Sequence, residues 1–209
     1  MQQVFIKGRG TKPHDVFFTS DLHFGHANVI KYCNRPTTAE EQDEWLISQI
    51  NSVVPQNAIV YHLGDFSLKR DKEYLTNIMK RLNGTWHVVL GNHDVKPALS
   101  HAASESDNIV LGWYWSERFY KDQSCKDIYA DIKMMHFPIE SWDCKHRGAI
   151  HLHGHLHGGT SNGAVQKLNN RLDVGLDAQG NHVPFCLQDI VEKLLTESTT
   201  HSTINDTTN

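Results

Sequence analysis

Asp, Asn and His side chains recur in five short motifs along the 209-residue chain, which read "DLH", "GD", "GNHD", "MHFP" and "GHLH". The candidate metal ligands in these motifs are Asp21, His23, Asp65, Asn92, His136, His155 and His157. Carboxylate, amide and imidazole groups without a thiolate suit divalent ions such as Mn, Fe, Ni or Zn. Seven ligands are too many for one zinc, whereas two ions that share a carboxylate keep positions open for water and a substrate oxygen. The motifs therefore predict a dinuclear metal site of the kind that suits phosphoester hydrolysis.

The first three motifs come at the ends of predicted strands over residues 15–20, 58–65 and 86–94, which are short apolar segments of the buried type. Between them, residues 37–54 and 72–82 carry apolar side chains at helical spacing, and Pro55 follows the first of these helices. Alternating strands and helices predict an α/β fold with parallel strands. Because the carboxyl ends of such strands form the ligand crevice, we expect the three motifs to meet there.

From about residue 108 the chain consists of shorter β-like segments, over residues 108–115, 116–122, 131–138, 149–155 and 171–177. They predict a second, less regular sheet. Residues 187–195 predict a closing helix, and the Ser, Thr and Asn-rich residues 196–209 have almost nothing to bury. We therefore expect one domain over residues 1–195 and a disordered tail over 196–209.

Each motif also has an interpretation without function. A segment such as Asp21-Leu22-His23, taken alone, is more often a turn or a helix cap than a pair of ligands. A Gly-Asp pair alone is still weaker evidence for a metal ligand. His136 could be a hydrogen-bonded core histidine. All five motifs nevertheless occur in one chain, at strand ends and in one order. This combination favours a metal site over five unrelated structural roles.

The ordered motifs resemble those of the calcineurin-like metallophosphoesterase superfamily, whose pattern runs D-x-H, G-D, G-N-H-[DE], H, G-H-x-H. The resemblance covers residues 16–177 and includes "LDVGLD", which is similar to a Val-Gly-x-Asp strand of many small members. The opening "FTSDLHFGH" resembles compact single-domain bacterial and bacteriophage members. The resemblance implies an α/β (α+β) fold in which two facing mixed sheets are flanked by helices, with the metals at the strand carboxyl ends.

Carried over to this sequence, the resemblance implies a role for each motif residue. The first ion would be held by Asp21, His23 and His157. The second would be held by Asn92, His136 and His155. Asp65 would bridge the two ions, and a water between them would become a hydroxide that attacks phosphorus. His93 is not a ligand in the family and resembles the catalytic residue that faces the substrate and protonates the leaving oxygen or stabilises the transition state.

The chain departs from the protein Ser/Thr phosphatases, which extend the second motif as Gly-Asp-x-x-Asp-Arg-Gly. Here the segment reads "GDFSLKR", with Leu68 at the place of the second Asp. This argues against a protein phosphatase. Lys69 or Arg70 could reach a phosphate, or both could be solvated charges at a helix start. His26 could line the substrate pocket or cap the following helix.

Four histidines alternate in "IHLHGHLHGG", and we interpret them as two pairs. Gly154 is expected to let the chain leave the strand in a tight turn, so that His155 and His157 approach the ions from a loop. His151 and His153 precede the turn and are expected to be packed or to support a ligand. The possible substrate-binding or supporting residues are thus His26, Arg70, Asp94 and His153.

The bulk composition bounds the class of protein. Net charge is −4, so there is no general attraction to nucleic acid, and no apolar run suggests a signal peptide or a membrane span. We expect a cytoplasmic protein, in a host cytoplasm if it is encoded by a bacteriophage, without a membrane partner. Four scattered cysteines suit reduced thiols. The sequence leaves the oligomeric state open.

Three hypotheses for function follow. The first is a phosphodiesterase or phosphatase with two divalent ions (Mn, Fe, Ni or Zn) that acts on nucleotides or cyclic nucleotides. The second is a nuclease or end-processing phosphatase, for which residues 95–130 are the candidate insert; aromatics such as Trp113 and Tyr114 could stack on bases there or belong to the core. The third is a non-catalytic binding scaffold, which is disfavoured because all seven ligand positions and His93 are present.

Overall fold

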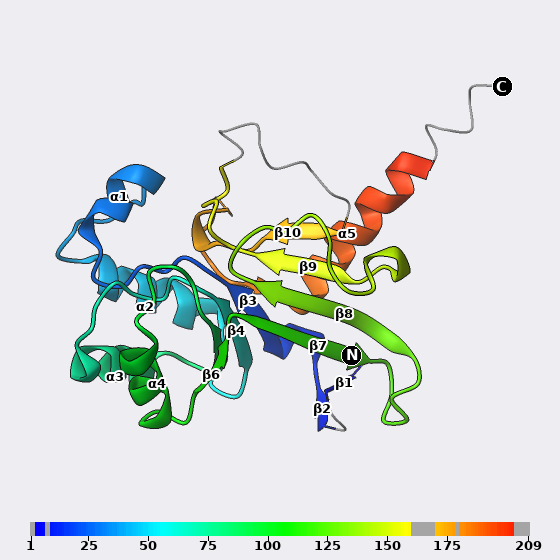
Figure 1. Cartoon of the computed structure of the whole chain (residues 1–209), viewed down its shortest axis with the longest axis horizontal. Coiled ribbons are helices and arrows are strands. Elements are labelled where there is room, and N and C mark those ends of the chain that lie inside the picture. Colours follow the sequence, from blue (N-terminus) through cyan, green and yellow to red (C-terminus); the bar gives the residue numbers. More distant parts are fainter. Residues whose placement is uncertain (1–2, 7–8, 160–169, 179, 203–209) are drawn as a thin grey trace.

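Two mixed β-sheets face each other in the computed structural model, which describes residues 3–6, 9–159, 170–178 and 180–202 (Figure 1). The five-stranded sheet has the order β11-β3-β4-β5-β6, with strands β3 Val16–Thr19, β4 Ile59–Leu63, β5 Thr85–Val89, β6 Ile109–Gly112 and β11 Phe185–Cys186. The six-stranded sheet has the order β10-β9-β8-β7-β1-β2, with strands β1 Val4–Ile6, β2 Arg9–Thr11, β7 Tyr114–Tyr120, β8 Ile128–Met135, β9 Ile150–His153 and β10 Arg171–Asp173.

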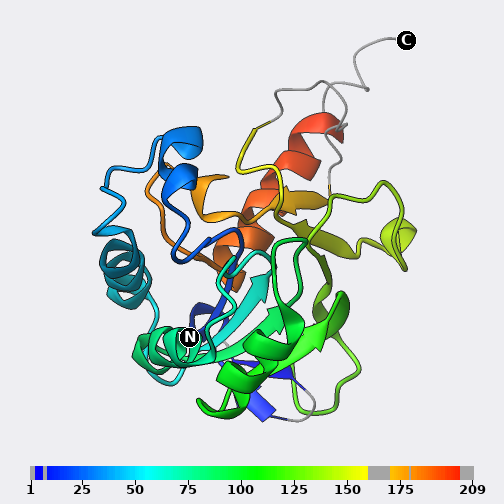
Figure 2. The same cartoon turned by 60° about the vertical axis from the view of Figure 1, so that its left-hand side comes forward.

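Helices flank this pair of sheets (Figure 2). They are α1 Ala27–Cys33, α2 Gln42–Val53, α3 Lys72–Arg81, α4 Lys96–Ser104 and α5 Leu187–Ser202, together with the short 3-10 helices η1 Pro13–Asp15, η2 Lys145–Arg147 and η3 Leu176–Ala178. The prediction of two facing mixed sheets flanked by helices is confirmed. In the described part of the chain, no helix is both long and apolar enough to cross a membrane.

Two apolar clusters hold the layers together. One lies between the five-stranded sheet and helices α2, α3 and α4, and it contains the fully buried Trp86 and Leu46. The other lies between the inner faces of the two sheets, where Phe18 stacks on Tyr61 and meets the edge of Phe119. Helix α5 adds Leu187 and Ile190 to this second cluster. Each sheet is thus fixed against a neighbouring layer, which makes its strand ends a rigid base for side chains.

Strand direction brings the motif loops to one end of the molecule. Strands β3, β4, β5 and β6 are mutually parallel, and so are β8, β9 and β10. In Figure 1 the arrowheads of β8 and β9 point to the side on which α1 lies. The loops that follow β3, β4, β5, β8 and β9 carry the five motifs. The expected convergence at the carboxyl ends therefore occurs, and it involves both sheets.

Several predicted boundaries shift because tertiary contacts override local signals. The helix predicted over 37–54 begins at Gln42, whose side chain donates to the His23 carbonyl oxygen at 2.9 Å, while Asp43 accepts from the Gly25 N–H. The first turn of α2 thus holds the loop after β3. Helix α3 begins as predicted, because Asp71 caps it by accepting from the N–H groups of Glu73 and Tyr74.

The region from 95 to 130 is not an insert. It forms α4 and β6, which belong to the layers of the five-stranded sheet, and then β7 in the six-stranded sheet. The segment 108–115 was predicted to lie in the second sheet, but β6 pairs with β5 in the first. Its aromatics divide, since Trp115 packs against the inner cluster, whereas Trp113 is 54% exposed and Tyr114 is 43% exposed.

The closing helix is longer than the sequence suggested. Helix α5 continues to Ser202, beyond the predicted end at residue 195, because "TESTTHS" contains neither Gly nor Pro to stop it. Residues 196–202 belong to this helix and residues 203–209 lie outside the described residues, so the expected disorder of the tail stays a prediction. All four cysteines are free, as predicted for reduced thiols.

Candidate metal centre

The loops after β3 and β4 run side by side beyond the end of the sheet. The N–H of Asp21 donates to the Gly64 carbonyl at 3.0 Å, and the N–H of His23 donates to the Asp65 carbonyl at 3.0 Å. Ser20 donates its hydroxyl to the carbonyl oxygens of Leu63 and Gly64. The parallel pairing of the two strands thus continues into the motifs and brings Asp21, His23 and Asp65 together.

The predicted ligands have an unusual backbone conformation. In the described part of the chain, ten non-glycine residues have positive φ, and five of them are Asp21, His23, Asp65, His155 and His157. The left-handed conformation costs an L-residue roughly 1–2 kcal/mol. Such strain persists where the surrounding structure over-determines it, and it concentrates at functional sites. The loops therefore present these side chains at the expense of local backbone stability.

Asp21, His23 and His157 form a group that could hold one cation, because one ligand atom from each lies within 4.8 Å of the others. The Nε2 atom of His157 is 3.7 Å from Oδ1 of Asp21. His23 is 3% exposed, and within the described residues neither of its ring nitrogens has a hydrogen-bond partner. Buried polar atoms are rarely left unpaired. These orphaned nitrogens fit a metal ligand.

Asp65 lies between this group and a second one. Its Oδ2 atom is 3.7 Å from Nε2 of His23 and 3.3 Å from Nε2 of His136. Asp21, Asp65 and His136 form another group whose ligand atoms lie within 4.8 Å of one another. Asn92 joins it, since its Oδ1 atom is 3.0 Å from Nε2 of His136. Asp65 therefore lies between the two groups of candidate ligands, and its role as a bridge between two ions stays a prediction.

His155 lies at the rim of the second group. Its side chain belongs to neither three-residue group, and its ring meets the edges of the His136 and Phe137 rings at centroid distances of 5.1 and 4.8 Å. Its backbone N–H donates to Asp21 Oδ2 at 2.9 Å. The structure therefore brings six of the seven predicted ligands into contact and leaves the His155 ring beside them.

The pKa values of two members of the first group, Asp21 and His23, also fit a divalent cation. Burial raises the pKa of Asp21 to about 7 and lowers the pKa of His23 to about 3. Burial lowers the pKa of His157 as well, but the hydrogen bonds with Asp177 and Cys33 and the nearby Asp21 carboxylate together outweigh burial and raise that pKa to about 10. A cation beside Asp21 would favour the carboxylate, and His23 is already the neutral imidazole that metals bind.

Two glycines allow the loops to approach each other. A Cβ atom on Gly91 would overlap the Asp65 backbone and carboxylate, and one on Gly154 would overlap Ser20 Oγ and the Asp21 carboxylate. The expected reason for Gly154 was a turn that needs its conformational freedom, and this is wrong. Gly154 is absent from the positive-φ glycines among the described residues, so the need is for space.

Asp94 ties the second and third motifs together. Its Oδ2 atom accepts from the N–H groups of Asp65 and Gly91, both at 2.9 Å, and its Oδ1 atom accepts from those of Phe66 and Ser67 at 2.8 and 3.2 Å. Asp94 thus supports the loop that carries Asp65. These four hydrogen bonds fit the expectation that Asp94 supports the site.

A pocket of about 380 Å³ opens over the two groups. It is lined by His23, His26, Val29, Tyr32, Cys33, Asp65, His93, His155 and His157. The side chain of His93 is 45% exposed, with Nε2 3.9 Å from Asp65 Oδ2. A larger pocket of about 610 Å³ between β8, β9 and α5 is lined by none of the predicted site residues.

His26 and Arg70 differ in their relation to this pocket. His26 is the N-cap residue of α1 but makes no side-chain capping bond, and its ring lies 5.5 Å from that of His23. His26 was expected either to line the substrate pocket or to cap the helix, and its contacts fit the first role. Arg70 is exposed and does not line the pocket, so the contacts favour a solvated charge.

His151 and His153 are buried in β9, just before the loop that carries His155 and His157. The ring of His151 lies within hydrogen-bond distance of backbone atoms of Lys133, Phe137 and Ile139. His153 Nδ1 is 2.9 Å from the carbonyl oxygen of Gly154. Both histidines make backbone contacts at the turn rather than contacts with a predicted ligand.

Sequence reasoning missed two charged residues at the site. Arg35 and Asp177 form an ion pair whose side chains are 0% and 2% exposed, and Asp177 Oδ2 is 2.8 Å from His157 Nδ1. Asp177 follows β10 much as the motif residues follow their strands, which is a signal that could have found it. Arg35 stands in the turn after α1, where no spacing rule singles it out.

A family profile described as calcineurin-like phosphoesterase matches residues 14–159, a span that includes all five motifs. The chain belongs to this family. Its members are generally metal-dependent phosphoester hydrolases, and the Asp and His groups of the site are those that could bind metal in this chain. The resemblance inferred from the motifs is thereby confirmed.

Relatives of this chain occur in an archaeon and in bacteriophages. The uncharacterized protein MJ1445 of Methanocaldococcus jannaschii is 31% identical over 197 residues, covering 91% of this chain and 97% of its own. The gene 66 protein of Mycobacterium phage L5 is 27% identical over 191 residues, covering 81% of this chain and 89% of its own.

A solved structure supports the fold of the family member. A protein of unknown function from Aquifex aeolicus, AQ665, superposes with a TM-score of 0.62 and 21% sequence identity, covering 85% of this chain and 97% of its own. At this level of identity the likeness concerns the fold alone. The two chains share an architecture over nearly the whole of the smaller one.

Proposed function

We propose that the protein is a dinuclear metal-dependent phosphoester hydrolase that acts on nucleotides or cyclic nucleotides. The observation that carries the proposal is the position of the Asp65 carboxylate, whose Oδ2 atom lies 3.7 Å from His23 Nε2 and 3.3 Å from His136 Nε2. A carboxylate shared by two groups of ligands suits two ions. An open pocket above them gives a phosphate access.

The chain's own residues would have distinct roles. Bound divalent ions would activate a water and neutralise charge on the phosphate. One ion would be held by Asp21, His23 and His157. The other ion would be held by Asn92, His136 and His155. Asp65 would bind both ions. These seven side chains orient the site, and none of them is needed as a proton donor.

His93 is the group placed to move a proton. Its backbone N–H donates to Asp65 Oδ1 at 2.9 Å, which fixes the residue, while its side chain is free to face the pocket. A histidine can donate a proton near pH 7 without large retuning of its pKa. Protonation of the leaving oxygen by His93 would make an alkoxide such as a ribose oxygen an adequate leaving group.

An aromatic wall supports a nucleotide as substrate. Tyr32 on α1 lines the pocket and is 79% exposed, and Val29 lies one helical turn before it. Stacking of a base on an aromatic side chain is worth roughly 1–3 kcal/mol. The Tyr32 ring would therefore favour a substrate that carries a base.

The activity can be tested with protein loaded with Mn²⁺ or Ni²⁺. Hydrolysis of bis-p-nitrophenyl phosphate and p-nitrophenyl phosphate is followed first, and then that of mononucleotides and of 2′,3′- and 3′,5′-cyclic nucleotides. Asp65→Asn should abolish turnover, and His93→Ala should lower turnover of nucleotides. His101→Ala is the matched control for His93→Ala, because His101 is an exposed histidine on α4. Absence of turnover on every substrate would refute the proposal.

The substrate class has its own test. Tyr32→Ala should raise KM for a mononucleotide by about 5- to 150-fold, as the stacking energy predicts, and leave KM for ribose 5-phosphate unchanged. An equal change for both substrates would show that Tyr32 does not bind the base.

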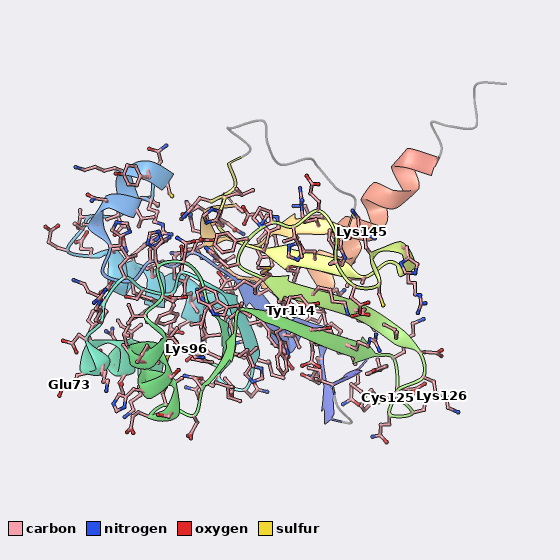
Figure 3. The ribbon with its side chains drawn as sticks, in the orientation of Figure 1. Glu73, Lys96, Tyr114, Cys125, Lys126 and Lys145 are labelled. Atoms are coloured by element: carbon pink, nitrogen blue, oxygen red, sulfur yellow. The ribbon has the colours of Figure 1, made fainter. Side chains whose placement is uncertain are left out.

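Exposed aromatics at and just before the start of β7 favour a nuclease as a second candidate. Tyr114, labelled in Figure 3 at the start of β7, pairs with Met135, the residue before His136. The preceding Trp113 is 54% exposed, and the Gly112 carbonyl accepts from Leu90 N–H close to the third motif. A single strand could stack here. Cleavage of oligonucleotides that Trp113→Ala weakens, with mononucleotides unaffected, would identify a nuclease.

A further inference from the structure

A buried ion pair lies directly behind the first group of ligands. Arg35 donates from Nε to Asp177 Oδ1 at 2.8 Å and from Nη2 to Asp177 Oδ2 at 2.9 Å. The two parallel hydrogen bonds fix the orientation of the carboxylate as well as its position. Both side chains are almost completely buried. A pair of charges is seldom withdrawn from water in this way unless its geometry is fully satisfied.

Arg35 also binds the backbone of the first motif. Its Nη2 donates to the Asp21 carbonyl oxygen at 2.6 Å, and its Nη1 donates to the Leu22 carbonyl oxygen at 2.7 Å. These carbonyls belong to the segment in which Asp21 and His23 adopt the left-handed conformation. One guanidinium thus fixes the strained loop that carries two of the three ligands.

Asp177 acts on the third ligand. Its Oδ2 atom lies 2.8 Å from Nδ1 of His157, while Nε2 of the same ring faces Asp21 Oδ1 at 3.7 Å. A carboxylate that accepts from Nδ1–H fixes the tautomer, so that the Nε2 lone pair points toward the position of an ion. Arg35 therefore contacts the loop that carries Asp21 and His23 directly, and it acts on His157 through Asp177.

We propose that Arg35 and Asp177 are positioning residues of the first metal position: Asp177 orients His157, and Arg35 fixes both Asp177 and the Asp21–His23 loop. The inference rests on the proposed function in so far as that function requires an ion at this group. It assigns a role to residues that lie outside the five motifs. Neither side chain touches the pocket, so both act through the ligands.

A cation bound by Asp177 itself is the competing interpretation. Cys33 Sγ, His157 Nδ1 and an Asp177 oxygen also lie within 4.8 Å of one another. However, both carboxylate oxygens of Asp177 already accept from Arg35, whose positive charge would repel a cation there. Cys33 lies 3.2 Å from His157 Nδ1 and adds a weak contact to the same ring nitrogen. The group fits a support for His157 better than a third metal position.

Binding of Mn²⁺ alone, measured by calorimetry, tests the proposal. The wild type should bind two ions, and Asp177→Asn should weaken one of them by 10- to 100-fold and leave the other unchanged. Since the His157 ring must lose a proton when it binds an ion, titrations between pH 7.5 and 9 are fitted to give the pH-independent constant. Loss confined to one ion is a result that a general structural defect would not give.

Asp131→Asn is the matched control, because Asp131 forms an ion pair with the buried Lys133 at 2.8 Å on β8, away from the site. It should leave both affinities unchanged. Arg35→Lys keeps both charges but not the four hydrogen bonds of Arg35, and it should weaken the same ion. If Asp177→Asn gives no folded protein, Arg35→Lys carries the test alone.

The outcomes separate this inference from the proposed function. Equal weakening of both ions, or unchanged binding in both variants, would overturn the positioning role. A wild type that binds two ions but hydrolyses nothing would overturn the proposed activity and leave the positioning role intact. A wild type that binds no ion would overturn both.

Discussion

Replacement of Asp94 by Asn isolates the energy that holds the second motif in place. The Asp94 carboxylate uses both oxygens, each accepting from two backbone N–H groups of the segments around Asp65 and Gly91. Asn has one acceptor oxygen and one NH2 group. Whichever way the amide is turned, its NH2 group faces two N–H donors that have lost their acceptor.

The magnitude follows from the number of bonds lost. A hydrogen bond to a charged group contributes about 1.5–3 kcal/mol, and Asp94→Asn removes two of the four. The two hydrogen bonds that remain are weaker, because the amide oxygen of Asn carries no negative charge. We therefore expect the free energy of unfolding to fall by about 3 kcal/mol or more. At pH 8 the wild-type carboxylate is ionised, because burial raises the pKa of Asp94 only to about 6.

Urea denaturation at pH 8 in the presence of a chelator, followed by circular dichroism, measures this loss without any contribution from metal. Asp71→Asn is the matched control, because a single oxygen of Asp71 accepts both capping bonds at the start of α3. Asn keeps that oxygen and is an equally good N-cap, so the loss should be under about 1 kcal/mol. Equal losses for the two variants would refute the reasoning about Asp94.

Three further predictions concern the metal groups and the pocket. The pKa values are about 7 for Asp21 and about 10 for His157, so an ion must displace at least one proton when it binds. The affinity for Mn²⁺, measured by calorimetry, should therefore rise about tenfold per pH unit from pH 7 to 9. An affinity that does not change with pH would contradict the protonation of His157. Gly154→Ala should weaken Mn²⁺ binding at least about tenfold, because the new methyl group overlaps Asp21 and the anchored Ser20; unchanged affinity would show that the loop can yield. His93→Ala should lower kcat on a nucleotide by about 100-fold or more but affect p-nitrophenyl esters much less, since p-nitrophenolate leaves without a proton; equal effects would exclude a proton donor.

The positions of the motifs were predictable because they depend on local signals. Short apolar strands followed by Asp21, Asp65 and Asn92 are visible in the sequence, and parallel strands bring their carboxyl ends together whatever the details of packing. The ligand grouping implied by the family resemblance also agrees with the proximity of Asp21, His23 and His157.

Features that depend on tertiary contacts were not predictable in the same way. The start of α2 is set by the bonds of Gln42 and Asp43 to the loop after β3, which no local pattern contains. Strand β6 joins the first sheet because the chain crosses between sheets at Gly112, where φ is positive. Arg35 was missed for a related reason, since its partner Asp177 is 142 residues away in sequence.

The first group of ligands draws its members from both sheets. Asp21 and His23 follow β3 of the five-stranded sheet, while His157 follows β9 of the six-stranded sheet. A cation held by all three would be a cross-link between the halves of the sandwich, equivalent in topology to a disulfide that closes most of the chain into a loop. In the chain-entropy account, closure of a loop of about 100 residues restricts the unfolded state by roughly 5 kcal/mol. The ions of such a centre would thus stabilise the fold as well as take part in catalysis. A chelator would weaken the contact between the two sheets at the same time as it stops hydrolysis.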